Sequence, residues 1–334
     1  MERLIAIGTA EEAAQWGGVA GVPPLYPETL KRHAADDHWI LVGDGGETVG
    51  RCSLWWRRTP SLPGHRLGLI GHYAVRDAPS ARRLLLHACQ QLAGRGCTMA
   101  VGPMDGNTWR RYRLLTERGS EPVFFLEPDN PDDWPAHFVD PGFTPLAHYS
   151  SAINTDLSRE DPRIAQVADR LLAKGVRIRC LDQERIEHDL HAIYTVARFS
   201  FQSNFLYTPI EEEEFIAQYR QILPEVGPEL VLIAELYDQP IGFVFALPDL
   251  LQKGRGQAVD TIILKTIAVL PEHGGAGLGS LLIARCHEVA RELGYTRVIH
   301  ALMLDANYSR KISRHFAQTI RRYTLFAKVL GGAE

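Results

Sequence analysis

The sequence predicts a mixed α/β fold built from two tandem halves, and two observations lead to this prediction. Residues 261–303 form a strand, a glycine-rich turn, a helix and a second strand, the pattern of a parallel crossover unit. The same order occurs earlier, where strands expected at 67–75 and 97–101 flank a helix expected over 80–92. At 334 residues the chain is long enough for two domains, each with a mixed central sheet flanked by helices.

Each half is also expected to contain a β-hairpin before its crossover unit. The first hairpin joins strands at 38–42 and 49–56 through Asp44-Gly45-Gly46, after a helical lead-in over residues 1–37. The charged, proline-containing segment 156–163 reads as a linker, which divides the chain into domains 1–157 and 158–334. The remaining expected elements are strands at 176–180, 230–236, 241–247 and 323–330 and a helix over 184–199.

The turn of the second crossover unit carries Gly274, Gly275, Gly277 and Gly279 in six residues. Glycine accepts positive φ and lets a ligand approach the backbone, and the first amides of a helix attract anions. A pyrophosphate is therefore the expected ligand, with a plain strand-to-helix turn as the alternative. A P-loop lysine is absent from Leu278-Gly279-Ser280, and a dinucleotide motif belongs nearer the start of a sheet.

The stretch resembles the acyl-CoA loop of the GNAT N-acetyltransferase superfamily, and the resemblance covers roughly residues 175–330. The family motif is Arg/Gln-x-x-Gly-x-Gly/Ala after a strand that ends in a hydrophobic-Val-x-Pro pattern. Residues 268–272 (AVLPE) supply the lead-in, and Gly277 and Gly279 fill the two glycine positions. Gly274 stands where the family usually has Arg or Gln. The resemblance implies an acyl-CoA-dependent N-acyltransferase that uses acetyl-CoA, or another short acyl-CoA, as cosubstrate.

The N-terminal half is expected to be a degenerate copy of this domain without the cofactor loop. Only five residues separate Val75 from Ala81, none of them is glycine, and Pro79 removes one amide donor. The alternative is an unrelated α/β domain. The active site is therefore expected in the C-terminal half alone.

The resemblance also implies where the cosubstrate is held. The strands that carry Ile267 to Val269 and Arg297 to Leu302 splay apart, and the pantetheine arm pairs with the first of them like an added strand. The loop amides hold the phosphates, and an asparagine at the start of the next helix contacts the arm. The cofactor-binding residues so implied are Ile267, Ala268, Val269, Gly274, Gly275, Ala276, Gly277, Leu278, Gly279, Ser280 and Asn307.

Amide formation from a thioester requires a base for the amine, stabilisation of the oxyanion and a proton for the leaving thiolate. His300 is the candidate base because the usual pKa of imidazole suits neutral pH, although a lone histidine in a strand is more often structural. The family's general-acid tyrosine falls on Arg314 in this sequence. Tyr308 or Ser313 is expected to substitute, with Tyr323 and solvent as the alternatives.

The acceptor is expected between the first two helices of the second half, by the same resemblance. The candidate contacts are Phe201, Asn204 and Tyr207, unless this segment is an aromatic hinge packed on the sheet. Asp249 is a further candidate that could instead only turn the chain. A small amine or amino-acid derivative is the preferred acceptor.

Composition excludes several classes of protein. A net charge of −4 gives no basic surface for nucleic acid, and no apolar run approaches the length of a membrane helix. Five cysteines without metal-binding spacing indicate a reduced, cytoplasmic protein without a metal, for which a homodimer is one allowed assembly. The rival functions are a non-catalytic acyl-CoA-binding or regulatory protein and a purely structural interaction protein.

Overall fold

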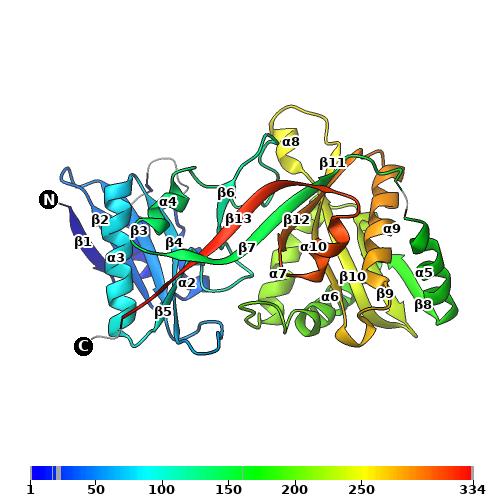
Figure 1. The fold of residues 1–334 in the computed structure, drawn as a ribbon, viewed down its shortest axis with the longest axis horizontal. Coiled ribbons are helices and arrows are strands. Elements are labelled where there is room, and N and C mark those ends of the chain that lie inside the picture. Colours follow the sequence, from blue (N-terminus) through cyan, green and yellow to red (C-terminus); the bar gives the residue numbers. More distant parts are fainter. Residues whose placement is uncertain (1, 17, 20–23, 160, 332–334) are drawn as a thin grey trace.

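A mixed β-sheet runs through both lobes of the molecule (Figure 1). The computed structural model describes residues 2–16, 18–19, 24–159 and 161–331, and the described part of the sheet has 13 strands. The predicted mixed α/β fold is confirmed. No helix in these ranges is long and apolar enough to cross a membrane.

The N-lobe is built on five neighbouring strands with helices packed against them. The strands are β1 (Arg3–Ile7), β2 (Asp37–Val42), β3 (Thr48–Trp55), β4 (Leu67–Val75) and β5 (Met99–Gly102). The helices are α1 (Ala10–Gln15), α2 (Pro27–His33), α3 (Ala78–Gly94) and α4 (Trp134–Val139). The strands β4 and β5 are parallel, whereas β1 to β4 pair in antiparallel order.

The C-lobe repeats this order in its own five strands. They are β8 (Val176–Cys180), β9 (Val231–Leu236), β10 (Gln239–Pro248), β11 (Thr261–Val269) and β12 (Arg297–Leu304), of which β11 and β12 are parallel. The helices are α5 (Pro162–Ala173), α6 (Ile186–Ser200), α7 (Glu212–Ile222), α8 (Leu250–Gly254), α9 (Leu278–Glu292) and α10 (Tyr308–Ser313).

Two long strands join the lobes by exchange. β7 (Thr144–Asn154) pairs with β12 of the C-lobe, and β13 (Gln318–Val329) returns to pair with β5 of the N-lobe and with the short β6 (Leu114–Glu117). β7 and β13 also pair with each other, so they form the bridge visible between the lobes in Figure 1. The boundary at residues 157 and 158 stays a prediction, under which each domain would complete the sheet of the other.

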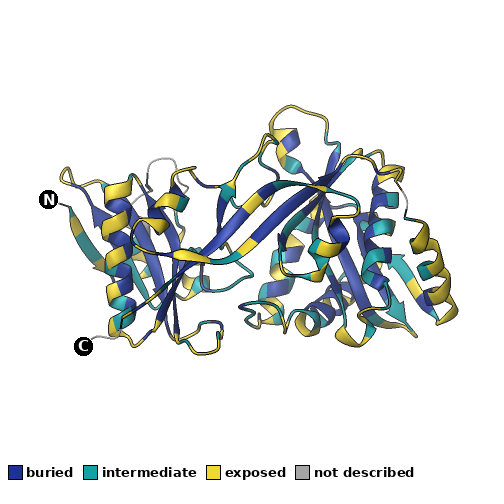
Figure 2. Ribbon diagram, viewed as in Figure 1, coloured by how far each residue is buried: buried dark blue, intermediate teal, exposed yellow. Residues whose placement is uncertain are grey.

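Amphipathic helices explain how the layers pack. In α3 the buried residues Ala81, Leu84, Leu85, Ala88 and Leu92 recur at intervals of three and four, which places them on one face against the sheet. The corresponding face of α9 carries Leu278, Leu281, Leu282, Cys286 and Ala290. Figure 2 shows the result, with buried strands and exposed outer helix faces in both lobes.

Two segments differ from the sequence-based expectations. The helical lead-in is wrong for Arg3–Ile7, which forms an edge strand on β2, although α1 and α2 follow it; residues 1, 17 and 20–23 of that segment lie outside the described residues. β7 was not predicted at all, because its sequence TPLAHYSSAIN lacks the apolar alternation of a strand.

Candidate active site

The parallel strands β11 and β12 separate at the centre of the C-lobe. They pair from Thr261 opposite Arg297 to Leu264 opposite His300, and no pairing between them continues beyond this point in the described structure. The rest of β11 pairs with β10 only, while β12 has an irregular register on β7 between His300 and Met303. The expected splay is therefore confirmed. We call the gap beyond Leu264 and His300 the open wedge.

A cavity of about 1550 Å³ adjoins the open wedge and is lined by both lobes. Its volume exceeds the roughly 300–1000 Å³ of most small-molecule sites. The walls from the C-lobe include Phe201, Asn204, Phe205, Tyr207, Tyr219, Lys265, Thr266, Ile267, His300, Ala301, Leu302, Met303, Leu304 and Asn307. The walls from residues before 157 include Trp109, Arg110, Arg113, Arg118, Phe125, Glu127, Asp129, Trp134 and Tyr149.

The glycine loop at the end of β11 has the conformation that an anion site needs. Gly277 is the N-terminal cap of α9 with φ of 89°, and no side chain caps this end in the described residues. The first helical hydrogen bond runs from Leu281 N to Gly277 O at 3.0 Å, so the amides of Leu278, Gly279 and Ser280 have no backbone acceptor among the described residues. These free donors and the helix dipole favour a phosphate here.

Helix α5 supports the loop from outside. A Cβ atom on Gly277 would lie 2.9 Å from Cγ1 of Val167, so a side chain cannot be placed here without a shift. Nη2 of Arg170 donates to the carbonyl oxygen of Ala276 at 2.8 Å. Packing against α5 thus restricts the residue at 277 to glycine, and the hydrogen bond from Arg170 holds the neighbouring backbone.

The structure separates the predicted cofactor residues into two groups. Ile267 and Asn307 lie in the cavity wall, whereas Ala268 and Val269 at the end of β11 and residues 274–280 beyond it lie outside the wall. Asn307 is the N-terminal cap of α10, and its Nδ2 lies 3.4 Å from Oδ1 of Asn204. Two predicted residues, one for the cosubstrate and one for the acceptor, therefore meet at the cavity wall.

The expected pKa of His300 is wrong. The side chain is 2% exposed, and this burial, together with neighbouring His287, lowers its pKa well below 6.5. Nε2 lies 2.9 Å from Nε2 of His287, and Nδ1 lies 2.8 Å from Oγ of Ser313. His300 is thus neutral at pH 7, and both of its ring nitrogens have partners.

The other catalytic candidates, Tyr308 and Ser313, are not part of the cavity wall. Ser313 is fully buried against His300, so its hydroxyl orients that ring. Tyr308 is 66% exposed at the first position of α10 and is not part of the cavity wall. Sequence reasoning placed these residues near His300 in the chain, but it could not show which way each side chain points.

An aromatic wall is formed by the predicted acceptor residues and by a tryptophan that the sequence did not single out. The ring of Trp109 lies 5.9 Å from that of Phe201 and 6.2 Å from that of Tyr207, and its Nε1 donates to the carbonyl oxygen of Thr208 at 2.8 Å. Trp109 comes from the loop after β5. No local signal in the sequence indicates that this loop reaches the segment after α6.

Asp249 has a structural role instead of the expected acceptor contact. It is 3% exposed, caps α8 by accepting from Leu251 N at 3.2 Å, and also accepts from Phe125 N at 2.8 Å. Its carboxylate lies outside the cavity wall. The acceptor role is therefore not retained, because the helix cap and the Phe125 amide use Oδ1, and Nη2 of Arg255 donates to Oδ2 at 3.4 Å.

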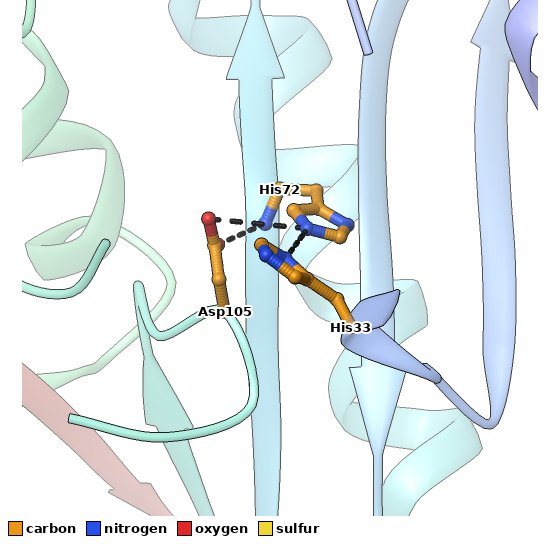
Figure 3. Close-up of side chains that lie close together, drawn as sticks. All are labelled: His33, His72 and Asp105. Carbon is orange, nitrogen blue, oxygen red and sulfur yellow. Dashed lines mark hydrogen bonds and ion pairs between the residues drawn. The ribbon is translucent and has the colours of Figure 1, made fainter. Parts of the chain in front are cut away.

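The N-lobe has a matching gap that is closed by its own residues. β4 and β5 pair from Leu67 to Leu69 only, and beyond this point Oδ1 of Asp105 accepts from the amide of His72 at 2.6 Å. The amide of Met104 donates to the carbonyl oxygen of Ile70 at 2.8 Å. We call this gap the filled wedge; Figure 3 shows His72 on β4 with Asp105 and His33 beside it.

His33, His72 and Asp105 could each offer one ligand atom to a metal ion, and these atoms lie within 4.8 Å of one another. Hydrogen bonds also account for the arrangement. Nδ1 of His33 lies 2.8 Å from Nε2 of His72, whose Nδ1 lies 2.9 Å from Oγ of Ser53. Burial lowers the pKa of each histidine to about 3, so both rings are neutral.

Comparison with known proteins agrees with this arrangement. Residues 190–319 match the profile of the Acetyltransferase (GNAT) family. The chain is 24% identical over 349 residues to Protein YghO of Escherichia coli (strain K12), with 92% of this chain and 88% of that protein aligned. It is 25% identical over 350 residues to the bacterial ceramide synthase of Caulobacter vibrioides (strain NA1000 / CB15N), with 92% and 90% aligned.

Among solved structures, the fold resembles that of a tandem GNAT protein from the clavulanic acid biosynthesis pathway. The two superpose with a TM-score of 0.52 at 14% identity, and the match covers 100% of both chains. The profile match thus covers most of the C-lobe, and the structural likeness extends over both lobes.

Proposed function

Because residues 190–319 match the Acetyltransferase (GNAT) family and the fold resembles that of a tandem GNAT protein, we propose that the chain transfers an acyl group from acyl-CoA to a primary amine. The observation that carries the proposal is the open wedge, which adjoins a large cavity and lies on the strand that leads into the glycine loop. These parts would provide a site for the donor and a separate space for the acceptor.

The donor site would use backbone atoms for most of its contacts. The amides of residues 275–280 would hold the pyrophosphate, a role supported by their lack of acceptors and by the glycine loop. Ile267, Ala268 and Val269 would pair with the pantetheine arm, because this edge of β11 has no strand partner in the described structure. An amide near Val269 would polarise the thioester carbonyl, and Asn307 would contact the arm from the opposite side.

Proton transfer would involve His300 as a relay rather than as a strong base. Its ring forms part of the cavity wall, but its lowered pKa makes it a poor proton acceptor, and it would have to give up one of two hydrogen bonds. Water would then be the final acceptor of the amine's proton. Tyr308, exposed beside Asn307, is the proposed acid for the leaving thiolate.

The acceptor would be an amine held against Phe201, Asn204, Tyr207 and Trp109. A small amine or an amino-acid derivative with an acetyl donor is the first candidate. The cavity volume and the likeness to a ceramide synthase favour a second candidate, because ceramide formation joins an acyl group to a long-chain amine. Both candidates require the same amide-forming chemistry.

A thiol-release assay tests the proposal. Acetyl-CoA, octanoyl-CoA and palmitoyl-CoA are each combined with short and long-chain primary amines, and the amide product is identified by mass spectrometry. We expect saturable thiol release that depends on one class of amine. Binding of every acyl-CoA without release by any amine would instead support the rival function, a non-catalytic acyl-CoA-binding or regulatory protein.

The cytoplasm remains the proposed location. All five cysteines are free thiols, and four of them are buried, as expected for a protein folded under reducing conditions. The partners that we propose are acyl-CoA and an amine. Whether the protein forms a homodimer is to be tested by light scattering.

A further inference from the structure

Arg113 is a buried cation in the cavity wall without an anionic partner. Its side chain belongs to a residue that is 5% exposed, and no carboxylate of the described residues lies within ion-pair distance of it. Two other arginines of the same wall are each paired with a carboxylate. Arg110 pairs with Glu214 at 3.0 Å, and Arg118 pairs with Asp129 at 2.8 Å.

The acidic side chain of Glu127, in the same wall, is already bound by other residues. Glu127 lies in the cavity wall, but its carboxylate accepts from Nε of Arg321 at 3.0 Å and from the hydroxyl of Tyr323. The charge of Arg113 therefore has no counterpart inside the protein among these residues. An uncompensated buried charge is unfavourable unless a ligand supplies the opposite charge.

Aromatic rings hold the guanidinium in a fixed position. Its carbon lies 4.1 Å from the ring centroid of Tyr112 and 4.3 Å from that of Tyr149, and Nη1 donates to the hydroxyl of Tyr112 at 2.8 Å. Nε is buried without a partner, and no described residue accepts from Nη2. The side chain is thus oriented by rings and one hydroxyl, with donor capacity left over.

The backbone places this cation beside the open wedge. Nη1 of Arg113 lies 3.4 Å from the carbonyl oxygen of Leu302, which lies two residues beyond the last β11 pair at His300 and within the irregular register of β12 on β7. Arg113 has φ of 66° and Leu302 has φ of 59°, values in the left-handed region that disfavour both side chains. Such backbone strain is concentrated at ligand-binding sites.

We propose that Arg113 binds an oxyanion, a carboxylate or a phosphate group, carried by the amine acceptor. The proposal rests on the proposed function, since it assigns part of the same cavity to the acceptor. The planar guanidinium suits two-point recognition of such a group. With the anion fixed at Arg113, the amine of the same molecule is directed into the open wedge next to Leu302.

Calorimetric binding in the presence of CoA tests this without requiring turnover. The probes are two matched pairs: O-phosphoethanolamine with ethanolamine, and 12-aminododecanoate with dodecylamine. For the wild type we expect, in one pair, the amine that carries the phosphate or carboxylate group to bind at least about tenfold more tightly than the amine without it. Arg113→Gln should lose this preference, and Arg113→Lys should keep part of it, because lysine retains the charge but not the fork.

Two further variants separate recognition from folding. Tyr112→Phe removes the hydroxyl that accepts from Nη1 and keeps the ring, so it should weaken the preference without changing CoA binding. Arg322→Gln removes an exposed arginine paired with Glu117 outside the cavity and should leave the preference unchanged. Melting temperatures of all variants show whether each one is folded.

Each outcome decides a separate point. Equal binding of both members of each pair to the wild type, or an equal loss for both in Arg113→Gln, would overturn the proposal. Tight, Arg113-dependent binding of inorganic phosphate that no amine displaces would assign the site to a free anion and would also overturn it. Anion-selective amine binding without thiol release would retain the anion site and contradict only the enzymatic function.

Discussion

The two crossover units of this protein share an architecture but differ at two positions, the N-terminus of the helix and the gap between the parallel strands. In the N-lobe, Asp77 caps α3, and its Oδ1 accepts from the amide of Ser80 at 2.9 Å. In the C-lobe, Gly277 caps α9 and no side chain of the described residues occupies the corresponding place. A carboxylate of the chain thus caps one helix terminus, while the other has no side-chain cap among the described residues and is the terminus that we propose for an anion.

The gaps between the parallel strands show the same difference. Asp105 accepts from His72 N inside the filled wedge, and a Cβ on Gly71 would overlap the carbonyl oxygen of Met104. The open wedge has no such insertion among the described residues and adjoins the cavity. The comparison teaches that the N-lobe satisfies its own backbone donors, and that it contributes to the site through Trp109 and Arg113 on loops that reach the C-lobe.

The largest effect that we expect is a loss of stability in acid, from both lobes together. Burial lowers the pKa of His72 to about 3 and that of His287 to about 4. Below pH 6.5 the unfolded chain binds more protons than the folded one, so stability falls from pH 6.5 down toward these values. At pH 5 each histidine should lower the free energy of unfolding by about 2 kcal/mol, because each pH unit between 6.5 and 5 contributes about 1.36 kcal/mol.

Urea unfolding at pH 7 and pH 5 measures this effect. His72→Gln and His287→Gln should each reduce the difference between the two pH values, because each removes one group that the unfolded state protonates. A wild-type free energy of unfolding that does not change between these pH values would contradict the buried, neutral state of both rings.

A smaller effect is expected from opening the filled wedge. Asp105→Ala leaves the buried amide of His72 without its acceptor and should reduce the free energy of unfolding by about 2 kcal/mol. Asp105→Asn keeps an oxygen at this position and should cost less. Chemical unfolding gives the stabilities, and calorimetry should give the same acetyl-CoA affinity for both variants and the wild type. A matching fall in affinity would show that the two wedges are not independent.

The smallest effect should come from restoring the side chain that GNAT loops usually carry. Gly274 has φ of −60°, which suits any residue, and a Cβ here would lie 3.0 Å from the carbonyl oxygen of Pro271, so a substitution requires a shift of a few tenths of an ångström. Gly274→Arg should tighten acetyl-CoA binding about fivefold, or about 1 kcal/mol, by adding a contact to the phosphates. Gly94→Arg places the same charge in open space at the end of α3 and is the control for net charge. Equal affinities of both variants would remove Gly274 from the donor site.

Local patterns were sufficient for much of the fold. The strands at 67–75 and 176–180 have the predicted bounds, because apolar runs ended by turn residues define them. β7 escaped prediction because Ser150 and Ser151 are buried on it, where each hydroxyl finds a partner in Asp305 or Tyr323. Such partners lie far away in sequence, so periodicity cannot reveal them.

Of the candidate site, only the glycine loop could be predicted, because it alone forms a local pattern in the sequence. Gly275 and Gly277 mark the loop because their positive φ values favour glycine. The burial of His300 and the approach of Trp109 and Arg113 depend on how the two lobes meet. Neither depends on a local pattern, so the sequence suggested a titrating His300 and missed the two residues from the N-lobe.

The central claim is that the chain has one donor site and that free amides at the start of α9 form its phosphate cradle. Calorimetric titration of acetyl-CoA into the wild type, Gly279→Glu and Gly279→Gln tests it most directly. A Cβ on Gly279 would lie 3.7 Å from Ile312, an ordinary contact, so both variants should fold. Gly279→Glu gives α9 a carboxylate of its own, as Asp77 does for α3.

We expect one acetyl-CoA per wild-type chain and an affinity at least about 30-fold weaker in Gly279→Glu, which corresponds to about 2 kcal/mol. Gly279→Gln should lose much less, because the repulsion between carboxylate and phosphate is absent. Two molecules bound per chain, or unchanged affinity in a folded Gly279→Glu, would contradict the account.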